Sequence, residues 1–219
     1  MSTRILRRSN ILGAVLLAAL STPATAQQEQ SAFDFYVLSL SWSPSFCRSD
    51  EGDANPLQCG DGSAYGFIVH GLWPQFERGY PEYCASDHPD RMPLEMGEPY
   101  FDIMPGMGLI GHQWRKHGTC TGLSPADYLD KTRRAFERIA IPEAFGSGEA
   151  LSDAPEDFEQ AFIAANRGMG ETGIAVTCES ADLAEIRICL TRDLAFRACP
   201  EVDASGCKRG EINLPPIDQ

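Results

Sequence analysis

The sequence predicts an α+β fold, in which helices pack against a mostly antiparallel β-sheet in a single disulfide-stabilised domain. Runs rich in aromatic and β-branched residues occur near both ends of the chain, and segments with a helical spacing of apolar residues lie between them. Eight cysteines accompany these segments, and an even number in an exported chain indicates disulfides. No repeat, low-complexity tract or linker divides the sequence, so one domain is expected.

The N-terminus has the pattern of a secretory signal peptide. Three arginines precede a short apolar run at residues 11–20, and Ala24-Thr25-Ala26 forms a small-residue cleavage site. An N-terminal membrane anchor is the alternative, but the apolar run is short for a span. We therefore expect a signal peptide over residues 1–26 and a single folded domain over residues 27–219. The mature protein is then exported, either periplasmic or secreted, and no later stretch is apolar enough to bind it to a membrane.

The chain is acidic, with a formal net charge of −13 that becomes −16 when the three leader arginines are removed. Proteins that bind nucleic acid over a wide surface usually carry a basic domain, so this class is disfavoured. An enzyme that holds one or two phosphates in a local basic pocket stays possible. A net negative charge keeps an exported protein soluble, and this is the expected reason for the acidic composition.

The first half of the chain predicts two buried strands separated by a loop. Residues 33–42 are rich in aromatic and β-branched residues and end at Ser43-Pro44, and residues 65–69 form a second apolar run that ends at His70. The polar residues 47–62 read as a loop between Cys47 and Cys59. Residues 75–108 also read as loop, with a weak helix at 92–96.

The second half predicts helices followed by an antiparallel meander. A short helix at 109–117 ends at Gly118, and Ser124-Pro125 has the pattern of an N-cap and first turn for a helix that runs to about residue 138. Apolar spacing predicts another helix over 155–166. The expected strands of the meander are residues 174–178, 183–191 and 194–199.

Two short segments concentrate the groups that can carry chemistry. His70-Gly71-Leu72-Trp73-Pro74 follows the second strand, where a histidine can project into a cleft. In the helix before Gly118, Lys116 and His117 lie three and four residues after Gln113, so the three side chains can share one face. His112 lies on an adjoining face of the same helix.

Two histidines at the ends of separate elements favour acid–base catalysis, in which one imidazole takes a proton while the other gives one. Lys116 or Arg115 could stabilise charge on a transferring phosphoryl group. RNA carries its own nucleophile, the ribose 2′-hydroxyl, so such a site needs neither a metal nor another cofactor. Trp73 offers a flat face for an unstacked base. The alternatives are structural histidines, core tryptophans and a solvated cationic helix face, and these residues alone leave them open.

The segments Phe67-Ile68-Val69-His70-Gly71-Leu72-Trp73-Pro74 and His112-Gln113-Trp114-Arg115-Lys116-His117-Gly118-Thr119-Cys120 resemble the two active-site segments of the ribonuclease T2 family, the acid, transferase-type endoribonucleases. Residues 35–47 are similar to the first strand of that family. Residues 174–199 are similar to its C-terminal strands. The likeness covers nearly the whole mature chain.

The resemblance implies a metal-independent, cofactor-free enzyme that cleaves single-stranded RNA. We expect a monomer that does not act on DNA. The 2′-hydroxyl attacks to give a 2′,3′-cyclic phosphate, which water opens to a 3′-phosphate. By position, His117 is then the first general base and His70 the general acid, while Lys116 stabilises the transition state. His112 contacts phosphate and Trp73 stacks on the base. The family's disulfide pairing implies the bonds Cys47–Cys59, Cys84–Cys120, Cys178–Cys207 and Cys189–Cys199.

Two positions depart from the family's pattern. Gln113 replaces the usual catalytic Glu; it cannot ionise but can donate a hydrogen bond to a phosphate oxygen. Gln75 replaces an Asp of the substrate-binding site in fungal members, which affects base preference. The main alternative is therefore a weakly active or inactive homologue that binds RNA. An inhibitor or receptor domain is disfavoured by the intact His70, Lys116 and His117 set.

Overall fold

The structure, a computed structural model, describes Met1 and residues 33–217. The predicted signal peptide, residues 1–26, lies outside the described residues except for Met1. The described residues from Phe33 onward form one unit around a six-stranded sheet.

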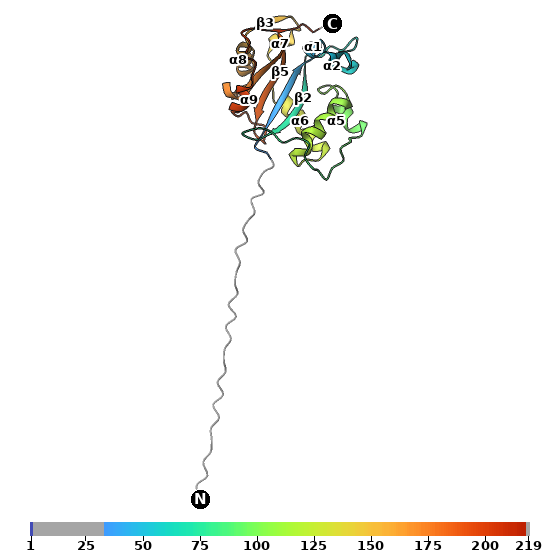
Figure 1. Ribbon diagram of the computed structural model, residues 1–219, viewed down its shortest axis with the longest axis vertical. Helices are drawn as coiled ribbons and strands as arrows, with labels where there is room; N and C mark the ends of the chain where they lie inside the picture. Colours follow the sequence, from blue (N-terminus) through green and yellow to red (C-terminus); the bar gives the residue numbers. More distant parts are fainter. Residues whose placement is uncertain (2–32, 218–219) are drawn as a thin grey trace. The chain divides into compact units, whose positions relative to one another are not determined.

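The sheet is mostly antiparallel, as predicted. β1 lies between β2 and β5 and is antiparallel to both (Figure 1). β4 is antiparallel to β5, and β3 is antiparallel to β6; only β5 and β6 pair in parallel, at Asp182 and Asn213. The strands are β1 (Phe35–Trp42), β2 (Phe67–Gln75), β3 (Leu151–Asp153), β4 (Ile174–Glu179), β5 (Asp182–Leu190) and β6 (Ile212–Leu214).

Helices complete the α+β fold, and the three predicted long ones are confirmed as α5, α6 and α8. The Ser124 hydroxyl caps α6 by accepting from the Asp127 backbone N–H. The α-helices are α1 (Ser43–Phe46), α2 (Asp50–Asp53), α3 (Pro56–Cys59), α4 (Leu94–Gly97), α5 (Met107–Lys116), α6 (Pro125–Glu137), α7 (Glu143–Gly146), α8 (Pro155–Ala165) and α9 (Pro200–Ala204). Single-turn 3₁₀ helices occupy η1 (Glu98–Tyr100), η2 (Gly118–Thr121) and η3 (Glu171–Gly173).

The two faces of β1 enter different cores, because successive side chains of a strand point to opposite sides. Tyr36, Leu38, Leu40 and Trp42 join the main core. In that core the Tyr128 hydroxyl of α6 donates to a backbone carbonyl of β2 at 3.1 Å. The opposite face starts with Phe35 and Val37, which pack in a smaller cluster with the Cys189 and Cys199 side chains. This second face carries the candidate site.

β2 does not end before His70, as the sequence suggested, but continues to Gln75. The apolar run stops at Val69, yet Trp73 and Pro74 still pair with β1. Pro74 lacks an N–H, and it is tolerated because β2 is an edge strand with only β1 beside it. His70 therefore lies inside β2, at the point where the register between β1 and β2 shifts, and this shift orients its side chain.

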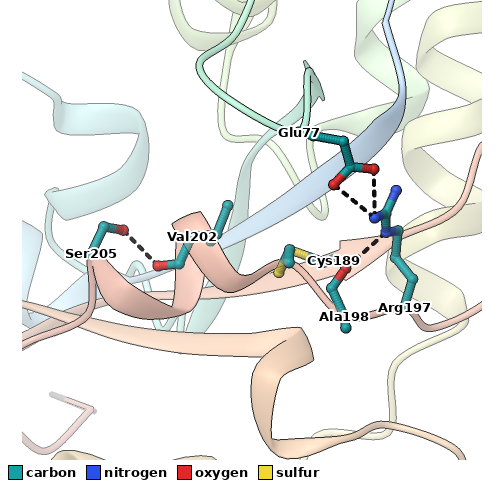
Figure 2. The surroundings of a disulfide bond; sticks show 7 residues. Glu77, Cys189, Arg197, Ala198, Val202 and Ser205 are labelled. Carbon is teal, nitrogen blue, oxygen red and sulfur yellow. Dashed lines mark hydrogen bonds and ion pairs between the residues drawn. A yellow bond between two sulfur atoms is a disulfide. The ribbon is translucent and has the colours of Figure 1, made fainter.

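The predicted third strand of the meander, residues 194–199, is wrong. Leu194 has a φ of 66°, which reverses the direction of the chain. The segment forms a single isolated β-bridge, between Phe196 and Leu190. The Cys189–Cys199 disulfide closes this ten-residue loop. Arg197 donates to the Glu77 carboxylate at 2.8 Å, which joins the loop to the segment just after β2. Figure 2 shows this pair beside the disulfide.

Shorter elements also escaped the sequence patterns. Residues 47–62 were expected to be loop but contain α2 and α3, and the weak helix at 92–96 is the single turn α4. β3 and β6 have three residues each, which is too short for an alternating pattern to be recognised. Within the described residues, no helix is both long and apolar enough to cross a membrane.

Four disulfides link the described cysteines in the pairs that the resemblance implies: Cys47–Cys59, Cys84–Cys120, Cys178–Cys207 and Cys189–Cys199. Cys84–Cys120 spans 36 residues and ties the segment after β2 to η2, directly behind the end of α5. Each such bond typically stabilises a fold by about 2–4 kcal/mol. The chain that follows β2 is thus covalently tied to the end of the helix that precedes His117.

Candidate active site

One cleft of about 500 Å³ brings together all seven residues singled out in the sequence. It opens on the face of the sheet that carries the smaller core, and α5 forms a further wall. The seven residues are His70, Trp73 and Gln75 of β2, His112, Gln113 and Lys116 of α5, and His117, which follows α5 directly.

His70 occupies a β-bulge. On β1, Ser39 pairs with Gly71 and the next residue, Leu40, pairs with Val69, so His70 is the extra residue without an opposite partner. A bulge re-aims a side chain and strengthens the local twist. The imidazole is about two-fifths exposed, and its Nδ1 is hydrogen-bonded to Oε1 of Glu185. That contact leaves Nε2 as the ring nitrogen available to a substrate.

Glu185 is a site residue that sequence reasoning missed. It lies on β5, is only 8% exposed, and is paired with both His70 and Arg187. Burial alone would raise the pKa of this carboxyl. The hydrogen bond and charge of His70, together with Arg187, outweigh that effect and lower the pKa to about 2. Glu185 is therefore a carboxylate at any pH near neutral. A usable signal was present in the sequence: two charged residues, two positions apart, within the otherwise apolar run 183–190.

His117 has a contrasting environment. It follows the last residue of α5, is 5% exposed, and its ring stacks on the Trp73 indole at 5.3 Å. Its Nδ1 is buried without a hydrogen-bond partner in the described part of the chain. Burial first, and then the charges of Lys116, His70 and His112, lower its pKa to about 3. His117 is thus neutral over the range where an ordinary histidine becomes charged.

Gln113 holds Trp73 in place. Its side chain is 1% exposed, and Oε1 accepts a hydrogen bond of 2.8 Å from the Trp73 Nε1–H. Gly71 permits this contact, since a Cβ there would lie 2.2 Å from Oε1 of Gln113 and 2.3 Å from Nε1 of Trp73. The glycine after His70 therefore serves the packing of the cleft wall.

The remaining predicted residues also line the cleft, and they differ in how far their side chains are exposed to solvent. Lys116 is half-buried, and its Nζ is 3.8 Å from the Glu82 carboxylate, a weak ion pair. His112 is exposed, and partial burial followed by the charges of Lys116 and Arg115 lowers its pKa. Gln75 is buried at 8% exposure. Lys116 is therefore a cation of the cleft wall that an incoming phosphate can reach.

The cleft is also lined by residues that no sequence pattern had indicated. Tyr80, which is 52% exposed, lies in the segment after β2, with its ring 6.4 Å from that of His117. Glu201 of α9 reaches back to accept from the Gly79 backbone N–H at 2.7 Å. Both depend on long-range folding of loops over the sheet.

The two histidines flank one aromatic ring and differ in their surroundings. The His70 ring meets the edge of Trp73 at 5.4 Å, and His117 stacks on the same indole. The His70 imidazole is paired with a carboxylate, and the His117 imidazole is buried among cationic groups that favour its neutral form. The cleft thus presents two imidazoles in contrasting environments.

The chain belongs to the ribonuclease T2 family, whose model matches residues 33–199, and it is an endoribonuclease of that family. It is 39% identical to a ribonuclease of Aeromonas hydrophila over 155 residues, which covers 64% of this chain and 69% of that protein. It is 29% identical to Ribonuclease I of Escherichia coli K12 over 235 residues, which covers 85% and 87%. The solved structure of an RNase-related protein from Calystegia sepium has the same fold, with a TM-score of 0.68 at 19% identity and coverage of 85% and 98%.

Proposed function

We propose that the chain cleaves single-stranded RNA without a metal, in two steps that use His117 and His70. The single observation that supports this most is the contrast between the two imidazoles, one buried and neutral, the other paired with a carboxylate. RNA brings its own nucleophile, so these two groups supply the proton transfers that the reaction needs.

In the first step, neutral His117 takes the proton of the ribose 2′-hydroxyl while the 2′-oxygen bonds to phosphorus. The bond from phosphorus to the 5′-oxygen breaks, and the His70 Nε2–H gives its proton to that oxygen. In the second step His70 takes a proton from water, and the water oxygen attacks the cyclic phosphate. The 2′-oxygen leaves with the proton that His117 received, which yields a 3′-phosphate.

The other cleft residues bind and orient the substrate in this proposal. Lys116 and His112 contact the phosphate, and Lys116 stabilises the charge that develops on it. The Gln113 carbonyl holds Trp73, which leaves the amide N–H groups for a phosphate oxygen. Trp73 and the exposed Tyr80 offer aromatic faces to an unstacked base. Gln75 lies where base preference is set.

Export to the periplasm or the medium is part of the proposal. The leader-like residues 1–26 support it, as do four disulfides, since such bonds persist in oxidising compartments.

The test is the initial rate of cleavage of a short RNA in EDTA as a function of pH. We expect a bell-shaped dependence of kcat/KM, with an acid limb below the ordinary histidine value of 6.5 and towards 3. The sign follows from His117, because lowering the pH through its depressed pKa protonates the base and stops the reaction. Absence of cleavage at every pH contradicts the proposal, and RNA binding without product would favour a binding homologue. An acid limb at or above 6.5 contradicts the environment assigned to His117.

A further inference from the structure

Glu185 and Arg187 form a charged pair on the floor of the cleft. They are two residues apart on β5, so they point to the same face of the sheet. On that face they lie opposite Ser41 and Ser39 of β1, beyond the apolar residues of the smaller core. Charged groups in the middle of a central strand are costly unless they are paired.

Each oxygen of the Glu185 carboxylate has its own partner. Oε1 is hydrogen-bonded to Nδ1 of His70. Oε2 accepts from Arg187, at 2.9 Å from Nε and 2.7 Å from the terminal nitrogen. The guanidinium carbon of Arg187 also lies 5.4 Å from the centre of the Trp73 ring, a cation–π contact. Arg187 thus fixes the carboxylate through the oxygen that His70 does not use.

This arrangement determines which nitrogen of His70 exchanges a proton. A carboxylate accepts hydrogen bonds only, so Nδ1 must carry a hydrogen in both the charged and the neutral ring. The proton that His70 gives or takes must then be the one on Nε2. A fixed negative charge beside the ring also stabilises the imidazolium, which is the form that a general acid needs.

We propose that Glu185 is the positioning residue of the general acid, holding His70 with Nε2 as its only exchanging nitrogen, and that Arg187 holds Glu185 in turn. The proposal rests on the proposed function, in which His70 protonates the leaving 5′-oxygen. Other charged and titratable groups that line the same cleft also bear on His70, and they come from α5, its C-terminal end and α9: His112, Lys116, His117 and Glu201.

The test compares Glu185→Gln with the unchanged protein on two substrates. One is a dinucleotide whose 5′-oxygen needs a proton to leave, and the other is a uridine 3′-(4-nitrophenyl phosphate), whose leaving group does not. We expect kcat on the dinucleotide to fall by about 10–100-fold, as for other groups that orient a functional imidazole. The nitrophenyl substrate should be turned over at nearly the original rate.

The pH dependence separates positioning from a merely structural role. In Glu185→Gln the alkaline limb of the profile should move to lower pH, since a neutral amide stabilises the His70 imidazolium less than a carboxylate does. Glu185→Asp keeps the charge and should restore part of that shift. Glu159→Gln is the matched control, because this half-buried carboxylate of α8 accepts from the Val176 N–H outside the cleft; its rates should equal those of the unchanged protein.

An NMR titration of the His70 ring without RNA gives a readout independent of turnover. Its pKa should be lower in Glu185→Gln than in the unchanged protein. Equal titration curves with an unmoved alkaline limb would overturn the role of Glu185, as would equal losses on both substrates. If the unchanged protein fails to cleave RNA in EDTA, the proposed function fails instead, and the titration still decides whether Glu185 controls His70.

Discussion

Replacing His117 with alanine is expected to lower kcat on RNA by about 10²–10⁴-fold, the usual contribution of a positioned general base. In the proposed mechanism His117 is the base of the first step and the acid of the second, so hydrolysis of a 2′,3′-cyclic nucleotide should fall as well. Steady-state rates on a dinucleotide and on a cyclic nucleotide measure both. KM should change less than kcat, because the phosphate and base contacts proposed for Lys116 and Tyr80 remain.

His88→Ala is the matched control for this variant. His88 is exposed, lies in the loop before α4, and contacts only the edge of the Trp114 ring at 6.4 Å among the ring contacts of the described chain. Its removal should leave both rates unchanged. A His117→Ala protein that is folded and retains full activity would refute the assignment of the base.

Replacing His70 with alanine is expected to have a comparable effect on RNA, with a different dependence on the leaving group. Without His70 the 5′-oxygen must leave as an alkoxide, so kcat on a dinucleotide should drop by about 10²–10⁴-fold. A nitrophenyl leaving group needs no proton, and its loss should be much smaller. The ratio of the two rates is the measurement.

This ratio also distinguishes the two histidines. His117→Ala removes the proposed base, which both substrates would require, so it should slow both. Equal losses on the two substrates in His70→Ala would contradict its role as the acid and would place it elsewhere in the mechanism.

The sequence identified most of the cleft because its residues occur in two short segments. A helical spacing of three and four puts Gln113, Lys116 and His117 on one side of α5, which is a local property of the chain. The aromatic and β-branched runs likewise located β1, β4 and β5. These features depend on neighbours within a few residues, and such patterns are readable without the fold.

The features that were missed depend on contacts between distant segments. The bulge at His70 is defined by its register with β1, and no local pattern marks it. Glu185 lies 115 residues after His70, and only the pairing of β5 with β1 brings the two together. The predicted strand at 194–199 failed because Leu194 reverses the chain and the Cys189–Cys199 bond closes the loop. Strand propensity depends on local sequence and therefore carries no information about these tertiary contacts.

The fold also gives Gln113 a structural role that the sequence alone did not indicate. In the sequence it raised the alternative of an inactive homologue, because the usual carboxylate is absent. In the structure its carbonyl oxygen fixes the indole on which His117 stacks. An uncharged side chain at this buried position leaves the neutral state of His117 to burial and to the surrounding cations.

The most direct test of the two-histidine mechanism is the identity of the first product. A short RNA incubated with the unchanged protein in EDTA can be followed by ³¹P NMR. The mechanism predicts that a 2′,3′-cyclic phosphate accumulates first and is then converted to a 3′-phosphate. Appearance of 5′-phosphate ends, or a requirement for added divalent metal, would contradict it.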